Sequence, residues 1–337
     1  MPYTKGNNYT RYFYHCFPQW VCSSDISVEP TYDSALRILE LMFKWGLLLT
    51  CEDIIFNGEP FRDEESSPKI RIPQRRLCFT ELAENELPNH AQVFGPIALE
   101  FDQRILRRIG VMPVIYIPQP LSNNPERDVF SLIGQTLVYR LNETYQILAD
   151  LAQIQEDIKD LPFGDHSVTL EHPETGFRSE FPVNLLQELF ENLTYRKQPL
   201  SQLAAATRLI SCFFYYTDAP TPRLIRDDGR LAYYREREWR VVSGPYFAGA
   251  SLEEELPPKA KDEIASLFDN SFSPYEKRKI NGSDFVKNCS LIRRFERNHI
   301  MNSIGRILVP EELKSEVTRL AHSYNYKGII AGYCTTE

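Results

Sequence analysis

Hydrophobic residues near the start of the chain recur with two different spacings, and these predict a strand, a helix and a second strand. The aromatic segment RYFYHCFPQW at 11–20 alternates in the way that is typical of a β-strand. Between Ser34 and Gly46 the hydrophobic residues follow helical spacing, and the glycine indicates the end of the helix. The apolar run LLLT at 47–50 predicts the next strand.

The same alternation of strands and short helices is expected further along the chain. Strands are predicted at 77–79, 95–101 and 111–118, with helices at 84–93 and 102–110. Near the end, a strand at 304–310, a helix at 311–324 and a strand at 327–333 form the clearest unit. Pro310 followed by two glutamates is typical of a helix start.

Between these β-rich parts, the pattern is helical. One apolar face runs along a long helix at 125–161, marked by Phe130, Ile133, Leu137, Leu141 and Leu148. A polar hairpin is expected around HPETG at 172–176, followed by helices near 183–192 and 201–213.

These elements predict an α+β protein with a central mixed or antiparallel β-sheet and a helical insertion. Residues 1–122 are expected to form the N-terminal, β-rich half of the core. Residues 123–225 form the helical insertion, and residues 226–337 form the C-terminal half, which ends in the strand–helix–strand unit.

Composition narrows the class of protein. The chain has 42% hydrophobic and 25% charged residues, which is typical of a globular protein. Its net charge of −8 argues against a general nucleic-acid binder. The first residues show no apolar stretch of signal-peptide length, and the longest apolar run, at 211–216, is too short to cross a bilayer. We therefore expect a cytoplasmic protein that has no membrane partner.

Common cofactor and metal motifs are missing from the sequence. There is no GxGxxG and no GxxxxGK[ST], so a Rossmann dinucleotide site and a P-loop are not expected. HExxH and GxSxG are missing too, and the seven cysteines are scattered without CxxC spacing. The sequence predicts no metal site and no disulfide framework.

Three single residues have both a structural and a functional interpretation. His15 lies in an aromatic strand, where a hydrogen-bonded core histidine is more common than a catalytic group. Cys78 is either a nucleophile at a strand end or a buried structural cysteine. Glu100 ends an apolar strand and is either a site carboxylate or the partner of an arginine.

The segment YYREREWRVV at 233–242 combines charges with a tryptophan. Strand alternation places Glu236, Glu238 and Arg240 on one face and Arg235, Arg237 and Trp239 on the other. A cross-strand charge ladder explains much of this pattern. The alternative is a cleft edge, in which one carboxylate works in a site and the tryptophan face is partly buried.

Three segments together carry a resemblance to a known family. They are RRLCFTELAENELPNHAQVFGPIALEFD at 75–102, YYREREWRVV at 233–242, and IGRILVPEEL…YKGIIAGY at 304–333. In this order they resemble the AbiGi-like abortive-infection proteins, which give bacteria phage resistance, and related uncharacterised bacterial proteins. The middle region, about 123 to 225, lies outside the resemblance. A more distant similarity connects the layout to ADP-ribosyltransferase-like folds.

That similarity implies a set of site residues. His15 would hold the NAD ribose, and Phe79 and Thr80 would form the middle-strand group. Glu238 or Glu236 would be the catalytic glutamate. It would stabilise the oxocarbenium-like state as the nicotinamide bond breaks. Tyr233 or Tyr234 would stack on nicotinamide, and Arg240 would also lie beside the cofactor. Arg240 could instead pair with its own glutamate.

Two functions are considered, the first suggested by the resemblance and the second by the amphipathic helical middle region. The first is an NAD-using defence effector, either an ADP-ribosyltransferase or an NAD glycohydrolase, with NAD as substrate and no metal. The second is a non-enzymatic, antitoxin-like or phage-sensing protein whose partner is a toxin, an antitoxin or a phage protein. A nucleic-acid enzyme, supported only by local arginines and by Glu100 with Asp102, is ranked last.

Overall fold

The described residues of the computed structural model fall into two compact units. These residues are 11–17, 32–57, 69–118, 129–161, 166–171, 175–193, 199–217, 237–243, 253–271 and 281–334. Unit 1 comprises Met1–Ile54, Ile72–Gln119 and Tyr215–Glu337. Unit 2 comprises Ile55–Arg71 and Pro120–Phe214.

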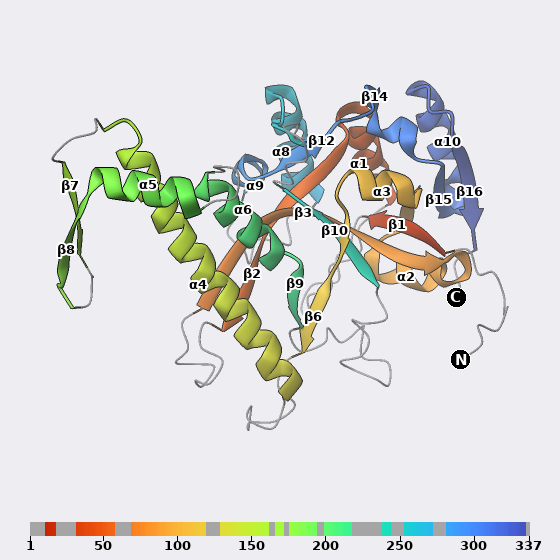
Figure 1. Ribbon diagram of the computed structural model, residues 1–337. Helices are drawn as coiled ribbons and strands as arrows, with labels where there is room; N and C mark the ends of the chain where they lie inside the picture. Colours follow the sequence, from red (N-terminus) through yellow and green to blue (C-terminus); the bar gives the residue numbers. More distant parts are fainter. Residues whose placement is uncertain are drawn as a thin grey trace. The chain divides into compact units, whose positions relative to one another are not determined.

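Unit 1 is built on a mixed sheet, which has ten strands within the described residues (Figure 1). The strand order is β11-β12-β2-β3-β1-β4-β15-β16, and β10 pairs with both β3 and β5. The strands are β1 (Arg11–Phe17), β2 (Leu47–Asn57), β3 (Lys69–Ala83), β4 (Ile97–Phe101), β5 (Met112–Pro113), β10 (Glu238–Val242), β11 (Glu253–Glu254), β12 (Ser290–Ile292), β15 (Arg306–Pro310) and β16 (Ile329–Tyr333). Only β15 and β16 are parallel among the pairs with a described register in this sheet. The predicted α+β architecture with a mixed central sheet is confirmed.

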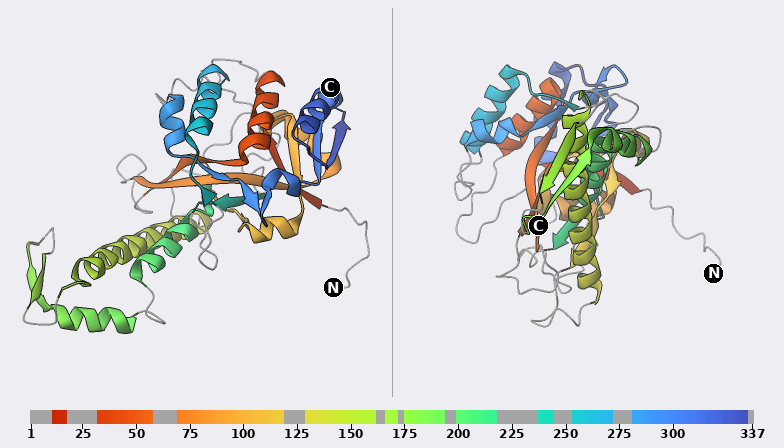
Figure 2. Two further views of the ribbon diagram at one scale, coloured as in Figure 1. Left: turned by 90° about the horizontal axis from the view of Figure 1, so that it is seen from above. Right: turned by 60° about the vertical axis from the view of Figure 1, so that its left-hand side comes forward.

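Helices lie on both sides of this sheet. Figure 2 shows on one side α1 (Tyr32–Trp45), α8 (Pro258–Ser271), α9 (Gly282–Lys287) and α10 (Lys314–Ser323). Leu39 of α1 and Val317 of α10 are fully buried there and belong to the largest hydrophobic cluster. On the opposite side, α2 (Leu87–Phe94) buries Leu87 in a smaller cluster with Tyr14 and Leu308. Apolar burial on both faces holds the strands in register.

Shorter elements complete unit 1. A short helix, α3 (Gln103–Arg108), follows β4, and Asp102 caps it by accepting a hydrogen bond from the Arg104 backbone. The 3₁₀ turns are η1 (Glu84–Glu86), η6 (Ile300–Ser303) and η7 (Glu311–Leu313). Two small two-stranded sheets are formed by β6 (Ile115–Pro118) with β9 (Phe214–Thr217) and by β13 (Arg294–Phe295) with β14 (Asn298–His299).

Strand β3 is much longer than its sequence pattern predicts. The pattern indicates only 77–79, but the strand extends from Lys69 to Ala83. Pro73 and the polar residue Gln74 interrupt the apolar alternation, so propensity alone does not favour a strand there. Pairing with β1 and β10 supplies the ladder hydrogen bonds that hold the central and C-terminal part of β3 extended.

Unit 2 is mainly helical. Its long helix α4 (Val129–Ile158) packs with α5 (Val183–Leu193) and α6 (Leu200–Ser211) around a small core of Ile158, Val183, Leu186, Phe190 and Leu200. Strands β7 (Ser167–Glu171) and β8 (Arg178–Pro182) pair in an antiparallel hairpin, which confirms the hairpin expected around HPETG. Although α4 is long, no described helix combines the length and the apolar character needed to cross a membrane.

Candidate functional site

The central sheet divides the predicted site residues between two faces. One face is apolar: Phe13, Phe79 and Leu99 lie there in the largest hydrophobic cluster. The opposite face, which we call the polar face, carries charged and hydroxyl side chains from five neighbouring strands. Because successive side chains of a strand point to opposite faces, the strand registers decide which of these groups meet.

A row of polar residues crosses the polar face. Arg306 of β15 is in register with Glu100 of β4, and Glu100 is in register with Tyr14 of β1. Tyr14 is in turn opposite Thr80 of β3, which is opposite Glu238 of β10. Residues directly opposite one another in neighbouring strands share a face. The five residues therefore form one continuous line, here called the polar row.

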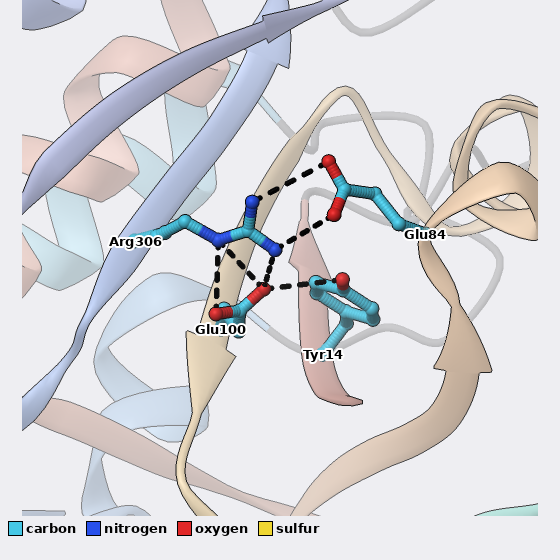
Figure 3. A network of polar contacts seen from close by, with 4 residues as sticks. All are labelled: Tyr14, Glu84, Glu100 and Arg306. Atoms are coloured by element: carbon cyan, nitrogen blue, oxygen red, sulfur yellow. Dashed lines mark hydrogen bonds and ion pairs between the residues drawn. The ribbon is translucent and has the colours of Figure 1, made fainter. Parts of the chain in front are cut away.

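At one end of the polar row, Arg306 is bound by two carboxylates (Figure 3). Its Nε donates to both oxygens of Glu100 at 3.0 Å, and its Nη2 donates to Oε2 of Glu84 at 2.9 Å. The Tyr14 hydroxyl donates to Glu100 Oε2 at 3.2 Å. The guanidinium also lies over the Tyr12 ring, 5.1 Å from its centre.

The electrostatics of this end favour a structural role. The hydrogen bond to Glu100, and after it the contacts with Glu84, raise the pKa of Arg306. Burial, reinforced by the Glu100 charge, raises the pKa of Tyr14 well above its ordinary value, so the hydroxyl stays protonated. Arg306 thus ties β15 to β4 and to the η1 turn. The structure therefore supports the interpretation of Glu100 as the partner of an arginine and not as a site carboxylate.

At the other end, Glu238 accepts hydrogen bonds from Arg240 and from Tyr116. Arg240 donates to Glu238 Oε1 through Nε at 3.1 Å and Nη2 at 2.7 Å, and the Tyr116 hydroxyl donates to Oε2 at 2.7 Å. The Arg240 side chain is fully buried, whereas 14% of the Glu238 side chain is exposed. Glu238 is thus a partly exposed carboxylate that rests on a buried arginine.

The charge of Glu238 is maintained by its neighbours. Burial by itself raises the pKa of this carboxyl. The charges of Arg240 and Arg76 lower the pKa, and so do the hydrogen bonds from Cys78 and Tyr116. The net result is a pKa below its usual range, so Glu238 is an anion at neutral pH. Such a group acts as an electrostatic stabiliser or hydrogen-bond acceptor, and does not supply a proton.

Cys78 lies between these charges but is not a nucleophile at neutral pH. It is in register with Arg240, on the same face as Glu238. Burial, followed by the Glu238 charge, raises the pKa of the Cys78 thiol to about 12. A protonated thiol is a weak nucleophile, so the buried structural interpretation fits this cysteine better.

His15 lies on the apolar face. Its ring is 5.6 Å from that of Phe17 and 6.0 Å from that of Phe79, centre to centre. Its Nδ1 is 2.9 Å from the Cys78 carbonyl oxygen, which requires the ring nitrogen to donate. Burial lowers the pKa of His15 to about 4, although this hydrogen bond opposes the shift. His15 is therefore a neutral, hydrogen-bonded residue among aromatic side chains.

The structure does not bring His15 and Glu238 together, because they point to opposite faces of the sheet. Phe79 shares the face of His15, and Thr80 shares the face of Glu238, so the two members of the predicted middle-strand group are also separated. Arg240 forms an ion pair with Glu238, but its side chain is fully buried, whereas a residue that contacts a cofactor has to be accessible. Glu236, Tyr233 and Tyr234 lie outside the described residues.

Trp239 is explained by the apolar face. Its ring packs edge-on against Phe13, with ring centres 5.3 Å apart, and it lies against the largest hydrophobic cluster. The preceding Arg237 forms an ion pair with Glu86 at 2.7 Å. Within β10, Trp239 thus faces the aromatic side and the Glu238–Arg240 ion pair the other, whereas Arg237 precedes the strand with φ +45° and is not placed by its alternation.

Sequence analysis missed three contributors to the polar face. Arg306, Tyr116 and Glu84 were not singled out as site residues, because each acquires a partner more than 100 residues away in sequence. Arg306 and Tyr116 each lie in a predicted strand, and strand membership was the only available signal. Their contribution depends on tertiary pairing.

The two carboxylates of the polar row are too far apart to act as a pair. Glu100 and Glu238 lie three strand spacings apart, which corresponds to about 14 Å between their backbones. Enzymes that cleave glycosidic bonds with two carboxylates hold them about 5 to 10 Å apart. Glu100 and Glu238 therefore do not form a catalytic pair, and their side chains are similarly exposed, at 11% and 14%.

Neither metal ligands nor relatives assign a role to this face. The described part of the chain contains no group of three or more histidine, cysteine, aspartate or glutamate side chains that could hold a metal ion. Comparisons with protein-family models, with curated proteins and with solved structures find no match.

Proposed function

We propose that this protein is a bacterial anti-phage defence protein that acts by binding a partner protein through unit 2. The observation that carries the proposal is the distribution of exposed apolar side chains. Of the fourteen large hydrophobic side chains that are exposed in the described residues, ten belong to unit 2. Exposed apolar residues that gather in one part of a molecule mark interaction surfaces, whereas single ones are unremarkable.

Helix α5 has the most regular of these exposed positions. Leu185, Leu189 and Leu193 recur every four residues, and 54%, 47% and 57% of their surfaces are exposed. The adjacent stripe of the same helix, which includes Leu186 and Phe190, is buried in the core of unit 2. The core therefore uses one stripe and leaves a second leucine stripe available to a partner helix.

Two other helices of unit 2 also carry exposed apolar side chains. Ile133, Leu137 and Ile147 of α4 fall within about a quarter of the helix circumference, and all three are exposed. Ile133 and Leu137 belong to the apolar face that the sequence identifies, so part of that face is not used by the core. On α6, Leu203 and Ile210 are seven residues apart and exposed on one side.

The charge of this region indicates the kind of partner. Between residues 120 and 214 the sequence has thirteen acidic and seven basic side chains, which accounts for most of the net charge of −8. Glu188 and Glu191 lie exposed on α5 near its leucine stripe. A partner segment with apolar anchors and basic flanks is complementary to this surface.

The defence role itself rests on the resemblance to AbiGi-like proteins. The three segments that carry it contribute β3, β4, β10, β15 and β16, which belong to one sheet. Segments 75–102 and 233–242 meet directly, because Cys78 is opposite Arg240 and Thr80 is opposite Glu238. The shared segments thus form one coherent unit, which supports the proposal.

The test replaces the α5 stripe with serine in the full chain, as Leu185→Ser, Leu189→Ser and Leu193→Ser together. Phage plating on bacteria that express each variant measures protection, and chemical cross-linking in the same cells measures partner binding. We expect protection and the cross-linked product to fall at least about tenfold, because several interface leucines are lost. The variant should unfold in urea close to wild type, since exposed side chains contribute little stability.

The matched control is Ile329→Ser on β16, an isoleucine exposed in unit 1. It should leave both protection and cross-linking unchanged. Full protection by the triple variant would contradict the proposal. Equal loss in the Ile329 control would mean that the effect is not specific to unit 2.

A second candidate function is cleavage of NAD at Glu238, and one observation favours it. The ionised Glu238 carboxylate lies beside the Thr80 hydroxyl on the polar face, where it could stabilise positive charge on a ribose. Incubation of the purified protein with labelled NAD tests this. Glu238→Gln should lower release of nicotinamide at least about 100-fold, whereas His15→Gln, on the other face, should leave the catalytic step intact.

A further inference from the structure

Two arginine-rich segments that are far apart in the sequence meet in unit 1. One is α3 with its flanks, residues 102–110, and the other is the β13–β14 hairpin with its flanks, residues 291–300. Together they contain six arginines, no lysine and two acidic residues, Asp102 and Glu296. An ion pair between Arg108 and Glu296 joins the two segments.

Apolar packing holds the two segments in this arrangement. Leu106 of α3 and Ile300 after the hairpin are buried in the same hydrophobic cluster of unit 1. Exposed arginines lie beside these buried residues, each within two residues along the chain of the Arg108–Glu296 ion pair. We call these four residues the arginine surface: Arg107, Arg108, Arg294 and Arg297.

Most of the arginine surface is not used by the fold. Arg108 pairs with Glu296, and the neighbouring Arg104 pairs with Asp102 at 2.9 Å, so both acidic residues of the two segments are engaged. Three exposed guanidinium groups form no hydrogen bond or ion pair within the described part of the chain: Arg107, Arg294 and Arg297.

This local excess of positive charge contrasts with the chain as a whole. The sequence has 46 acidic and 38 basic residues, so carboxylates that could neutralise a basic surface are plentiful. At the arginine surface, four guanidinium groups share one carboxylate, Glu296. Like charges in close proximity repel, and a bound anion relieves the repulsion. The net charge of −8 argues against nucleic-acid binding over the whole surface, but not at this site.

The hairpin turn places one of these cations at a cost to the backbone. Glu296 and Arg297, the two central residues of the turn, have φ +48° and +71°. Two-residue hairpin turns of this kind favour asparagine and glycine, because other residues adopt the left-handed region less readily. Turn propensity therefore does not explain an arginine at position 297, whereas a role for its charge does.

We propose that the arginine surface binds the phosphate backbone of a nucleic acid. A guanidinium group matches the geometry of phosphate oxygens and can bind two of them at once. Several separate arginines suit the repeated phosphates of a strand better than they suit one small anion. Contacts of this kind carry no base information, so we expect binding with little sequence preference.

A nucleic acid fits this surface better than a membrane does. Both segments are fully described, and neither exposes a large hydrophobic side chain. Peripheral membrane binding usually combines basic residues with apolar side chains that insert between the lipids. The inference goes beyond partner binding by unit 2 and does not depend on it.

The test measures binding of the full chain to a labelled RNA strand and a labelled DNA duplex by fluorescence anisotropy. The probes have about 20 nucleotides or base pairs, and salt is varied from about 50 to 200 mM. We expect at least one probe to bind with a Kd below about 100 μM at the lowest salt. The slope of log K against log salt concentration should be about −2 to −3, because three arginines each neutralise one phosphate.

The variant Arg107→Gln, Arg294→Gln, Arg297→Gln should weaken binding at least about tenfold and bring the salt slope close to zero. The matched control removes the same charge from exposed arginines elsewhere, as Arg140→Gln, Arg178→Gln and Arg319→Gln together. It should bind as the wild type does. Both variants should unfold in urea close to wild type, since all six side chains are exposed.

Salt-dependent binding that is lost in the arginine-surface variant and kept in the control supports the site. The proposal is overturned if the wild type binds neither probe, if the arginine-surface variant binds as tightly as the wild type, or if the control loses as much. Binding to phosphatidylserine vesicles without binding to either probe also overturns it. The α5 serine variant is scored by phage protection and cross-linking, so either proposal can fail while the other holds.

Discussion

At the scale of single residues, Glu238 and Arg240 form a deeply buried ion pair on the polar face. Arg240 is fully buried, and its hydrogen bonds go to a carboxylate that is 14% exposed. Burial works against the charge of Arg240, but Cys78 and Glu238 together hold its pKa above the ordinary value. A buried ion pair is costly to break, because the remaining charge stays in a low-dielectric environment.

We therefore expect Arg240→Met to reverse the direction in which stability changes with pH. In the wild type, the pKa of Glu238 is lowered on folding, so its stabilising contribution is present above the unfolded pKa and is lost as the pH falls through the folded pKa. Without Arg240, burial raises the pKa of Glu238, and stability should instead increase as the pH falls. We expect the free energy of unfolding at pH 7 to fall by about 3 to 5 kcal/mol.

Urea unfolding between pH 4 and pH 8, followed by tryptophan fluorescence, measures both the size and the slope of this effect. The double variant Arg240→Met, Glu238→Leu serves as control, because it removes both charges and should recover much of the stability. An Arg240→Met protein whose pH dependence has the same sign as the wild type would contradict the assignment.

At the scale of elements, a glycine decides how α1 is joined to β2. The predicted helix end at Gly46 is confirmed, since α1 ends at Trp45 and β2 begins at Leu47. Gly46 has φ +111°, and a Cβ there would lie 2.5 Å from the Ile292 carbonyl oxygen of β12. The sequence indicates that a glycine ends the helix, but the close approach of β12 is a tertiary constraint.

Gly46→Ala should therefore destabilise the protein by more than about 1 kcal/mol, through backbone strain and the contact with β12. Gly305→Ala is the matched control, because a Cβ at Gly305 meets nothing within 4 Å. Its effect on the free energy of unfolding should stay within about 0.5 kcal/mol. Thermal and urea unfolding of the two variants, side by side, decide between a specific and a general effect of adding a methyl group.

Element prediction succeeded where hydrophobic spacing was regular. The predicted helix over 34–46 matches α1, and the predicted strand at 304–310 contains β15. It fell short in β3, where Pro73 and Gln74 hide a strand that neighbouring strands stabilise. Hydrogen bonds between strands that are distant in sequence leave no local pattern, so the ends of such a strand are not predictable from spacing.

At the scale of the whole molecule, the two units differ in how they use apolar side chains. Unit 1 buries them on both faces of a large sheet, in clusters that include Phe79 on one side and Leu308 on the other. Unit 2 has a small core and carries most of the exposed apolar residues, together with most of the net negative charge. This division is the basis for the proposal that unit 2 binds a partner.

The sequence by itself determined the α+β class and, within each strand, which residues share a face. Period-two alternation correctly placed Glu238 with Arg240 and separated both from Trp239. Only the tertiary structure decided that the face of Glu238 is opposite to that of His15. The relative phase of two strands depends on their register through β3, and a shift of one residue would reverse it. Register is set by long-range packing, so a pair of residues in different strands can be proposed from sequence but placed on one face only by the fold.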